Sequence, residues 1–374
     1  MAIVGAFALP HPPLIIPDVG RGRERGIQAT IDACDEVGRR IAALAPQTIV
    51  ISSPHATLYR DYFHISPGDV ARGNFSAYGA GRAAYEAVYD TEFVDELVRA
   101  CEREGVEAGT DYERDPRLDH GTMIALHFIQ RHYHRDFKVV RLGLSGFSPA
   151  DHYRLGMLVQ RTARTLGRRV TYVASGDLSH KLLAEGPYGF APEGPVFDER
   201  ICGDFASGDL VDVLAMDLSL AERAAECGLR SFQIMVGALD RTEVRCELLS
   251  HEGPFGVGYG VAAFEPVGEE GTDDACDRLA RYEQIRAAEL AERKAREDVY
   301  VRLARASLEA FVRDGKRIEP AKGLPDGLPD ELVACRAGCF VSLKKDGALR
   351  GCIGTIAPTK ATLAEEICAN AISA

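Results

Sequence analysis

The sequence has no excess of basic residues and no long apolar segment. Its 374 residues contain 44 lysines and arginines against 56 aspartates and glutamates, which gives a formal net charge of −12. Nucleic-acid-binding proteins normally present a basic surface to the phosphate backbone, so we expect no nucleic-acid partner. The apolar runs are short, as in residues 48–52, whereas a helix needs about 20 apolar residues to cross a bilayer. We therefore expect no membrane partner either.

A secretion signal is also missing from the first residues. The segment MAIVGAFALPHPP is apolar, but it lacks a basic beginning and a small-residue cleavage site, so we interpret it as a first strand. The ten cysteines follow no framework spacing. Together these absences predict reduced thiols and a cytoplasmic location.

What the chain does contain is an alternation of short apolar runs and amphipathic helices. Runs of strand type occur at residues 3–9, 48–53, 138–144 and 170–175, and helical spacing at residues 27–44, 93–101, 153–165 and 232–239. This order predicts an α/β fold with a largely parallel central sheet flanked by helices. Residues 244–249 and 256–264 are expected to close the sheet as antiparallel strands.

The composition changes after Pro266, which predicts a second, smaller α+β domain. We expect a first domain at residues 1–266, a charged linker and helix at 267–297, and the second domain at 298–374. Within this region, residues 268–277 resemble an acidic linker, and the helix at 278–295 is expected to continue into 300–312. A hairpin is expected from residues 339–343 and 349–353.

Histidines follow three of the predicted parallel strands. His11 comes after the first strand, His55 after the second and His180 after residues 170–175, while His120 lies in a loop that opens a helix. Ligands of open α/β sheets bind at the carboxyl ends of the strands, so these histidines predict a shared polar site. Imidazole is the commonest protein metal ligand, and two histidines with a carboxylate form the facial set of non-haem Fe(II) oxygenases. The third ligand is sought at Glu226 or Cys227, and the residues alone leave both open.

The ordered motifs around these residues resemble a known superfamily. LPHPP at His11, SSPHA at His55, DHG at 119–121, SGDLSH at 175–180 and ECGLR at 226–230 are similar to class III extradiol dioxygenases, which include the Memo proteins. The resemblance covers about residues 1–266. It implies that His11, His55 and Glu226 hold Fe(II), that His180 is the acid/base residue, and that His120 contacts substrate or dioxygen. Memo-type members have a cysteine that corresponds to Cys227, so this thiol is the alternative ligand, and a thiolate favours Zn or Cu(I).

A second resemblance lies in the C-terminal part. GCFVSL at 338–343 and LRGCIGT at 349–355 are similar to the AMMECR-type domain, and the two domains in this order resemble proteins of AmmeMemoRadiSam systems. This implies a radical-SAM protein and other system proteins as partners, and it makes Arg350 and Cys352 further site candidates. The AMMECR-type domain continues past this strand, so the domain is expected to be truncated, with the apolar faces of Phe340, Leu343 and Ile353 unmatched.

These observations lead to a main hypothesis and two alternatives. The main one is an Fe(II)-dependent, extradiol-type dioxygenase that uses dioxygen on a catechol-like aromatic or related small molecule, with Asp177 fixing the tautomer of His180. The alternatives are a non-catalytic, Memo-like metal-binding or scaffold protein and a zinc-dependent hydrolase. We expect the imidazole nitrogens of His11 and His55 to lie within about 6 Å of each other. Only one of Glu226 and Cys227 is expected to face them, and a carboxylate for Fe(II) favours Glu226.

Overall fold

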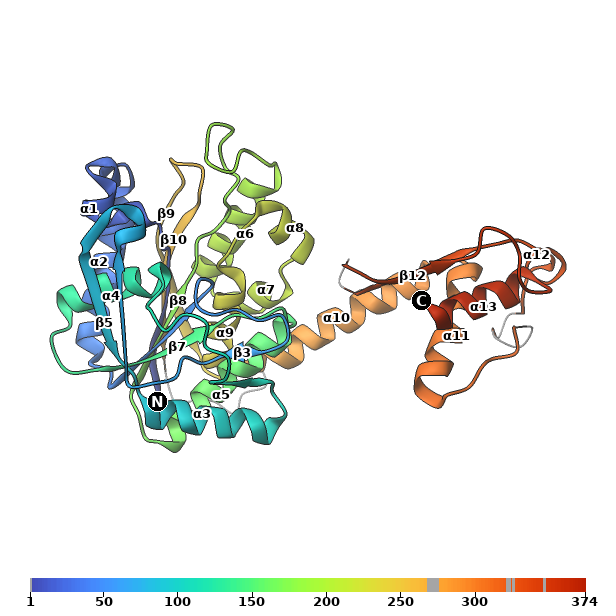
Figure 1. Ribbon diagram of the computed structural model, residues 1–374, viewed down its shortest axis with the longest axis horizontal. Helices are drawn as coiled ribbons and strands as arrows, with labels where there is room; N and C mark the ends of the chain where they lie inside the picture. Colours follow the sequence, from blue (N-terminus) through green and yellow to red (C-terminus); the bar gives the residue numbers. More distant parts are fainter. Residues whose placement is uncertain (1, 268–275, 321–323, 325–326, 346–347) are drawn as a thin grey trace. The chain divides into compact units, whose positions relative to one another are not determined.

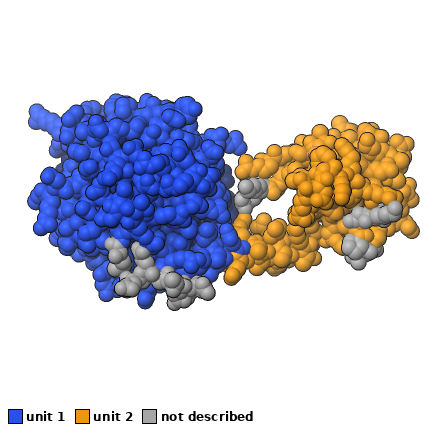
Figure 2. Space-filling model, turned by 90° about the horizontal axis from the view of Figure 1, so that it is seen from below, with its two compact units in different colours: residues 1–283 blue, residues 284–374 orange. Residues whose placement is uncertain are grey.

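The computed structural model describes residues 2–267, 276–320, 324, 327–345 and 348–374. The chain forms two compact units, Met1–Glu283 and Gln284–Ala374, which Figure 2 shows in separate colours. The division falls within the helix at residues 278–295. Most of the expected acidic linker, residues 268–275, lies outside the described residues. None of the described helices is long and apolar enough to cross a membrane.

Unit 1 is built around a six-stranded sheet with the order β7-β2-β8-β1-β10-β9 (Figure 1). The strands are β1 (Ile3–Leu9), β2 (Thr48–Ser53), β7 (Lys138–Gly143), β8 (Val170–Ser175), β9 (Val244–Glu252) and β10 (Tyr259–Pro266). The first four strands of this order are parallel, and β10 pairs antiparallel with both β1 and β9. The expected α/β fold with a mostly parallel sheet is therefore confirmed.

Helices pack on the sheet because its strands are apolar on both faces. Every residue of β2 and β8 is buried. The helices α2 (Gln28–Leu44) and α4 (His120–His132) pack against each other and share one core cluster with the side chains of Phe7, Ile49 and Ile51. The helix α9 (Leu229–Ala238) packs on the sheet strands and on α5 (Pro149–Thr165).

Glycines allow α5 and α9 to approach closely. A Cβ atom at Gly156 of α5 would lie 2.0 Å from the carbonyl oxygen of Ile234, and one at Gly237 would lie 2.0 Å from that of Tyr153. Real Cβ atoms do not approach backbone oxygens this closely, so any larger residue would push the two helices apart.

The sequence patterns did not predict several smaller elements of unit 1. The hairpin of β4 (Val70–Phe75) and β5 (Ala80–Val88) is rich in alanine, glycine and arginine, which have little strand preference. The short strands β3 (Phe63–His64) and β6 (Ala108–Gly109) pair with each other. The helices α1 (Pro17–Gly20), α6 (Glu193–Ser207), α7 (Leu210–Ala215) and α8 (Leu218–Ala224) were not predicted either, whereas α3 (Thr91–Glu104) contains the helix predicted at residues 93–101.

The predicted continuation of one helix into the next, between residues 278–295 and 300–312, is wrong. The helix α10 (Arg278–Ala295) does not continue into α11 (Val299–Asp314), because the side chain of Asp298 accepts a hydrogen bond from the amide of Val301 and begins a new helix. The first turn of α10 belongs to unit 1, and there the buried guanidinium of Arg278 donates to the carbonyls of Leu239 and Thr242 of the same unit.

The rest of unit 2 is a small α+β structure. It contains α12 (Asp330–Ala334), α13 (Leu363–Ser373) and the antiparallel pair β11 (Phe340–Lys345) and β12 (Ala348–Gly354). This pair confirms the predicted hairpin, although its turn, residues 346–347, lies outside the described residues. Phe340 is 69% exposed and Ile353 41% exposed, whereas Leu343 is half-buried. Arg350 and Cys352 lie on β12, and the Cys352 thiol accepts a hydrogen bond from Ser342 Oγ.

Candidate metal centre

Three histidines meet at the carboxyl edge of the parallel strands. His11 lies two residues after β1, His55 lies two residues after β2, and His120 is the first residue of α4. Each offers one ring nitrogen, and these three atoms all lie within 4.8 Å of one another. The Nε2 atoms of His11 and His55 are 3.0 Å apart, which confirms the predicted proximity of these two side chains. This triad could bind a metal ion.

A hydrogen-bond chain sets the tautomer of His11. The hydroxyl of Ser175, the last residue of β8, donates its single proton to the carbonyl of Gly121 at 3.0 Å. The same oxygen lies 2.9 Å from His11 Nδ1, so it must accept a proton from that nitrogen. His11 therefore keeps the lone pair of Nε2 free on the side of His55. This is the arrangement that a metal-ligating histidine requires.

His120 is positioned by the beginning of α4. The Asp119 side chain caps this helix, because its carboxylate accepts hydrogen bonds from the amide and the hydroxyl of Thr122. Burial, together with neighbouring His55 and His11, lowers the pKa of His120 to about 3. His120 is therefore neutral at physiological pH and offers a lone pair rather than a positive charge. It was predicted only to contact substrate or dioxygen, whereas the structure places it among the possible metal ligands.

Cys227, rather than Glu226, faces the histidines, which corrects the sequence-based preference. The Cys227 Sγ atom lies 3.5 Å from His11 Nε2. The Glu226 carboxylate instead accepts a 2.6 Å hydrogen bond from the amide of Leu229, the first residue of α9, because a helix N-terminus attracts a negative charge. Among the described residues, the cluster that could hold a metal ion consists of His11, His55 and His120 and includes neither Glu226 nor Cys227. As predicted, only one of the two residues points to the histidines. That residue is Cys227 and not Glu226.

Asp177 binds the backbone around the site rather than the ring of His180. Its carboxylate accepts a 2.7 Å hydrogen bond from the amide of His11, and its own amide donates to Cys227 Sγ at 3.3 Å. Burial raises the pKa of Asp177 to about 6. In the part of the chain that the structure describes, no hydrogen bond joins Asp177 to the His180 imidazole. The expected control of the His180 tautomer by Asp177 is therefore not supported, and the contacts of Asp177 connect His11 with Cys227.

His180 lies close to the triad but makes no ring hydrogen bond through its buried nitrogen. Its Nε2 atom has no partner among the described residues, and its ring stacks on Tyr188 with centroids 5.0 Å apart. Burial lowers the pKa of His180, and His55 adds to this effect, while the carboxylate of Asp177 opposes it. The ring of His180 is not part of the cavity wall described below, and its unpaired nitrogen is buried.

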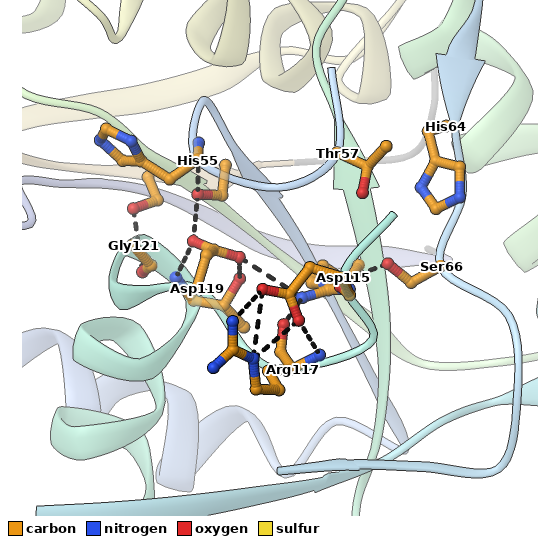
Figure 3. Close-up of polar contacts among 12 residues, drawn as sticks. His55, Thr57, His64, Ser66, Asp115, Arg117, Asp119 and Gly121 are labelled. Atoms are coloured by element: carbon orange, nitrogen blue, oxygen red, sulfur yellow. Dashed lines mark hydrogen bonds and ion pairs between the residues drawn. The ribbon is translucent and has the colours of Figure 1, made fainter. Parts of the chain in front are cut away.

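The polar contacts around Asp115, Arg117 and Asp119, drawn in Figure 3, include those of a buried arginine. Arg141 of β7 is 1% exposed, and its guanidinium donates to Ser66 Oγ at 2.6 Å and to the carbonyl of Arg117 at 2.7 Å. It also forms ion pairs with Glu113 at 3.3 Å and with Asp119 at 3.7 Å. Burial raises the pKa of Asp119, but the charge of Arg141 and the hydrogen bonds outweigh it and hold that pKa below its usual value. Asp119 in turn accepts a hydrogen bond from Ser53, next to the loop of His55.

A cavity of about 900 Å³ opens beside the triad. His55 and His120 form part of its wall, together with residues of the β4–β5 hairpin and of the segment 114–119. The hydroxyl of Tyr78 lies 3.4 Å from His120 Nδ1 on the same wall. A small molecule in this cavity would contact the two histidines directly. Tyr188 and Phe190, which were considered for the substrate wall, are exposed and are not among the residues that line it.

Three residues that hold the site in place were not identified from the sequence. Ser175 and Ser53 are hydroxyl residues at the ends of buried strands, and this position is the only signal that could have marked them. Arg141 is a charged residue among apolar ones in the buried part of β7, a pattern that indicates a buried ionic contact.

Comparison with known proteins identifies the family. Residues 5–262 match the family model described as the catalytic LigB subunit of aromatic ring-opening dioxygenase, and residues 301–374 match the AMMECR1 family. The chain therefore belongs to the LigB family and carries an AMMECR1 region after it. Among its relatives, protein CA_C1420 of Clostridium acetobutylicum is 37% identical over 381 residues, which cover all of this chain and 80% of the relative.

Further similarities are shorter. A protein of Thermotoga maritima is 53% identical over 79 residues, covering 21% of this chain and 43% of the relative. A MEMO1 family protein of Methanococcoides burtonii is 31% identical over 115 residues, covering 30% of this chain and 43% of the relative. The crystal structure of the uncharacterised protein JW3007 from Escherichia coli K12 aligns with a TM-score of 0.45 and 16% identity, over 70% of this chain and 99% of that chain.

Proposed function

We propose that unit 1 is a non-haem Fe(II)-dependent, extradiol-type dioxygenase that acts on a catechol-like aromatic or a related small molecule. The observation that carries this proposal is the triad of His11, His55 and His120 beside a 900 Å³ cavity, in a chain of the LigB family. Neutral imidazoles suit Fe(II), and they also suit Zn and Cu. Fe(II) at this triad would supply open coordination positions for a vicinal diol and for dioxygen.

The residues of the chain perform the remaining tasks. His11 and His55 direct ring nitrogens to one point, and Ser175 holds His11 in the tautomer that leaves Nε2 unprotonated. His180 is neutral at physiological pH, so its unpaired Nε2 can take up the proton that a substrate hydroxyl loses. His120 belongs to the triad and also lines the cavity, so its ring can contact a substrate oxygen there.

An anaerobic reconstitution with Fe(II) followed by oxygen uptake tests this proposal. Purified full-length protein is loaded with Fe(II) and mixed with a panel of catechols, and oxygen consumption is recorded. We expect His55→Ala to abolish both metal binding and oxygen uptake. His180→Gln should retain the metal but lose turnover, because only the proton acceptor is removed. His134→Ala is the matched control, since His134 is exposed and lies outside the triad. Uptake that persists in His180→Gln would contradict the role of His180.

A second candidate function is favoured by the position of Cys227. A thiol 3.5 Å from His11 Nε2 is a softer ligand than a carboxylate, and it suits Zn or Cu(I). This observation favours a Memo-like, metal-binding protein without ring-cleavage activity. Tight metal binding without oxygen uptake over the whole catechol panel would support this alternative.

Hydrolysis of an ester panel by the Zn-loaded protein would instead support a zinc hydrolase. A radical-SAM partner stays a prediction from the sequence resemblance.

A further inference from the structure

The cavity beside the triad contains more arginine than its carboxylates neutralise. Four arginines line it: Arg72, Arg114, Arg117 and Arg141. Arg72 Nε lies 2.6 Å from Glu86 Oε2, which is part of the same wall. Arg117 forms several contacts with Asp115, the shortest of them 2.7 Å. Each of these two arginines therefore has its own carboxylate partner.

Arg141 is also neutralised, although it is buried. Its guanidinium lies between the carboxylates of Glu113 and Asp119, at 3.3 Å and 3.7 Å. Its other donors are used by Ser66 Oγ and a backbone carbonyl. A ligand in the cavity would therefore find no unpaired charge at Arg141.

Arg114 is different, because it contacts an aromatic ring instead of a carboxylate. Its Cζ atom lies 4.5 Å from the centroid of the Tyr59 ring. The Tyr59 hydroxyl donates to the backbone carbonyl of Tyr112, which fixes the ring. Across the described residues, no hydrogen bond or ion pair engages the Arg114 guanidinium. An arginine remains charged at every physiological pH, and contact with a ring face leaves its N–H donors available.

We propose that Arg114 binds an anionic group, a carboxylate or a phosphate, on the small molecule that occupies this cavity. A guanidinium offers a planar set of donors that matches both anions and can bind either through two hydrogen bonds. The triad forms another part of the same wall through His55 and His120. The substrate class is therefore a small molecule with an anionic group that Arg114 holds while a different part of the molecule meets the histidines. This proposal rests on the proposed function in one respect, namely that the molecule bound at Arg114 is also the one that meets the metal.

Binding of matched anionic and neutral probes tests the proposal by isothermal titration calorimetry. Metal-free protein is titrated with phenylacetate and with phenyl phosphate, which carry an anion but no diol. Fe(II)-loaded protein is titrated without oxygen, with 3,4-dihydroxyphenylacetate and with its neutral counterpart 4-methylcatechol. We expect Arg114→Gln to weaken binding of the anionic probes about tenfold or more, because a charge-assisted hydrogen bond is lost. The affinity for 4-methylcatechol should not change. The tighter of the two diol-free probes identifies the anion as a carboxylate or a phosphate.

Two further variants separate the local contact from a general effect of charge. Arg114→Lys keeps the charge but loses the planar set of donors, so it should restore only part of the affinity. Arg82→Gln removes the same charge from an exposed position of β5 that does not line the cavity, and it should behave like the wild type. An equal loss in Arg82→Gln and Arg114→Gln would overturn the proposal, because it would show a long-range charge effect.

Other titration results would reject either the anion site at Arg114 or the proposed function. If neither anionic probe binds the wild-type protein at millimolar concentration, or if Arg114→Gln weakens 4-methylcatechol as much as the anionic diol, the anion site is wrong. If 4-methylcatechol fails to bind the Fe(II)-loaded protein while phenylacetate binds through Arg114, the anion site is supported and the proposed function fails. The two proposals are therefore distinguishable in one set of titrations.

Discussion

The number of protons released on metal binding should identify the ligands of the candidate centre. Burial lowers the pKa of His11 well below its ordinary value and that of His120 to about 3, and it also lowers the pKa of His55. These imidazoles are neutral at physiological pH and have no proton to lose. Burial raises the pKa of the Cys227 thiol well above its ordinary value, and the charge of Asp177 adds to this effect. Cys227 therefore has to lose a proton before it can bind a metal ion.

The expected number of protons released per metal ion follows from these pKa directions. Binding through the three histidines alone should release almost no protons, and the affinity should not depend on pH above about 6. Binding that includes Cys227 should release about one proton per metal ion, so the affinity should rise about tenfold per pH unit. Burial raises the pKa of Glu226 to about 7, so ligation by that carboxylate would release about half a proton at pH 7 and almost none near pH 8.5.

Anaerobic titration calorimetry with Fe(II) measures this number directly. The titration is run near pH 7 and near pH 8.5, in pairs of buffers with different heats of ionisation. The Cys227 thiol lies 3.5 Å from His11 Nε2, so we expect it to join the three histidines as a ligand. The wild type should then release about one proton at both pH values, and Cys227→Ser, the matched variant, almost none. A wild-type protein that releases no proton, together with a Cys227→Ser variant of unchanged affinity, would refute the assignment of Cys227. A value that falls with pH would point back to Glu226.

Three further predictions concern stability. Arg141→Met should lower the free energy of unfolding of unit 1 by about 3–5 kcal/mol, because Glu113 and Asp119 would lose the cation with which they form ion pairs. A denaturant titration measures this loss, and a value below about 1 kcal/mol would contradict the reasoning. The stabilising contribution of Asp119 is present above about pH 4 and is lost as pH falls below it, since its pKa is held below the ordinary value. The stability difference between the wild type and Asp119→Asn should therefore shrink near pH 3, and a difference that grows there would be inconsistent with it. Gly156→Ala should lower the melting temperature, because the new Cβ would meet a backbone oxygen of α9. Gly203→Ala, at a helix position with free space, should raise the melting temperature. Equal changes of melting temperature in the two variants would rule out the close contact of α5 with α9.

The sequence by itself determined the sheet and the place of the site. The strands β1, β2, β7 and β8 are short, apolar and buried, and such runs leave little ambiguity about their position in a parallel sheet. Residues after parallel strands meet at one edge of the sheet, so the sequence alone predicts that His11 meets His55. The hairpin of β4 and β5 could not, because alanine, glycine and arginine give no strand pattern and their pairing depends on packing over the core.

Only the tertiary structure decided which groups point into the site. Glu226 and Cys227 are neighbours in the sequence, and their directions depend on the turn before α9, in which Ala225 has a left-handed φ of 55°. In that turn the amide of Cys227 donates to the carbonyl of Asp177, which brings the thiol to His11, while the Glu226 carboxylate binds the beginning of α9. Contacts of this kind join segments about 50 residues apart, and no local pattern contains them. The sequence therefore located the candidate metal centre, whereas long-range packing decided which side chains face it.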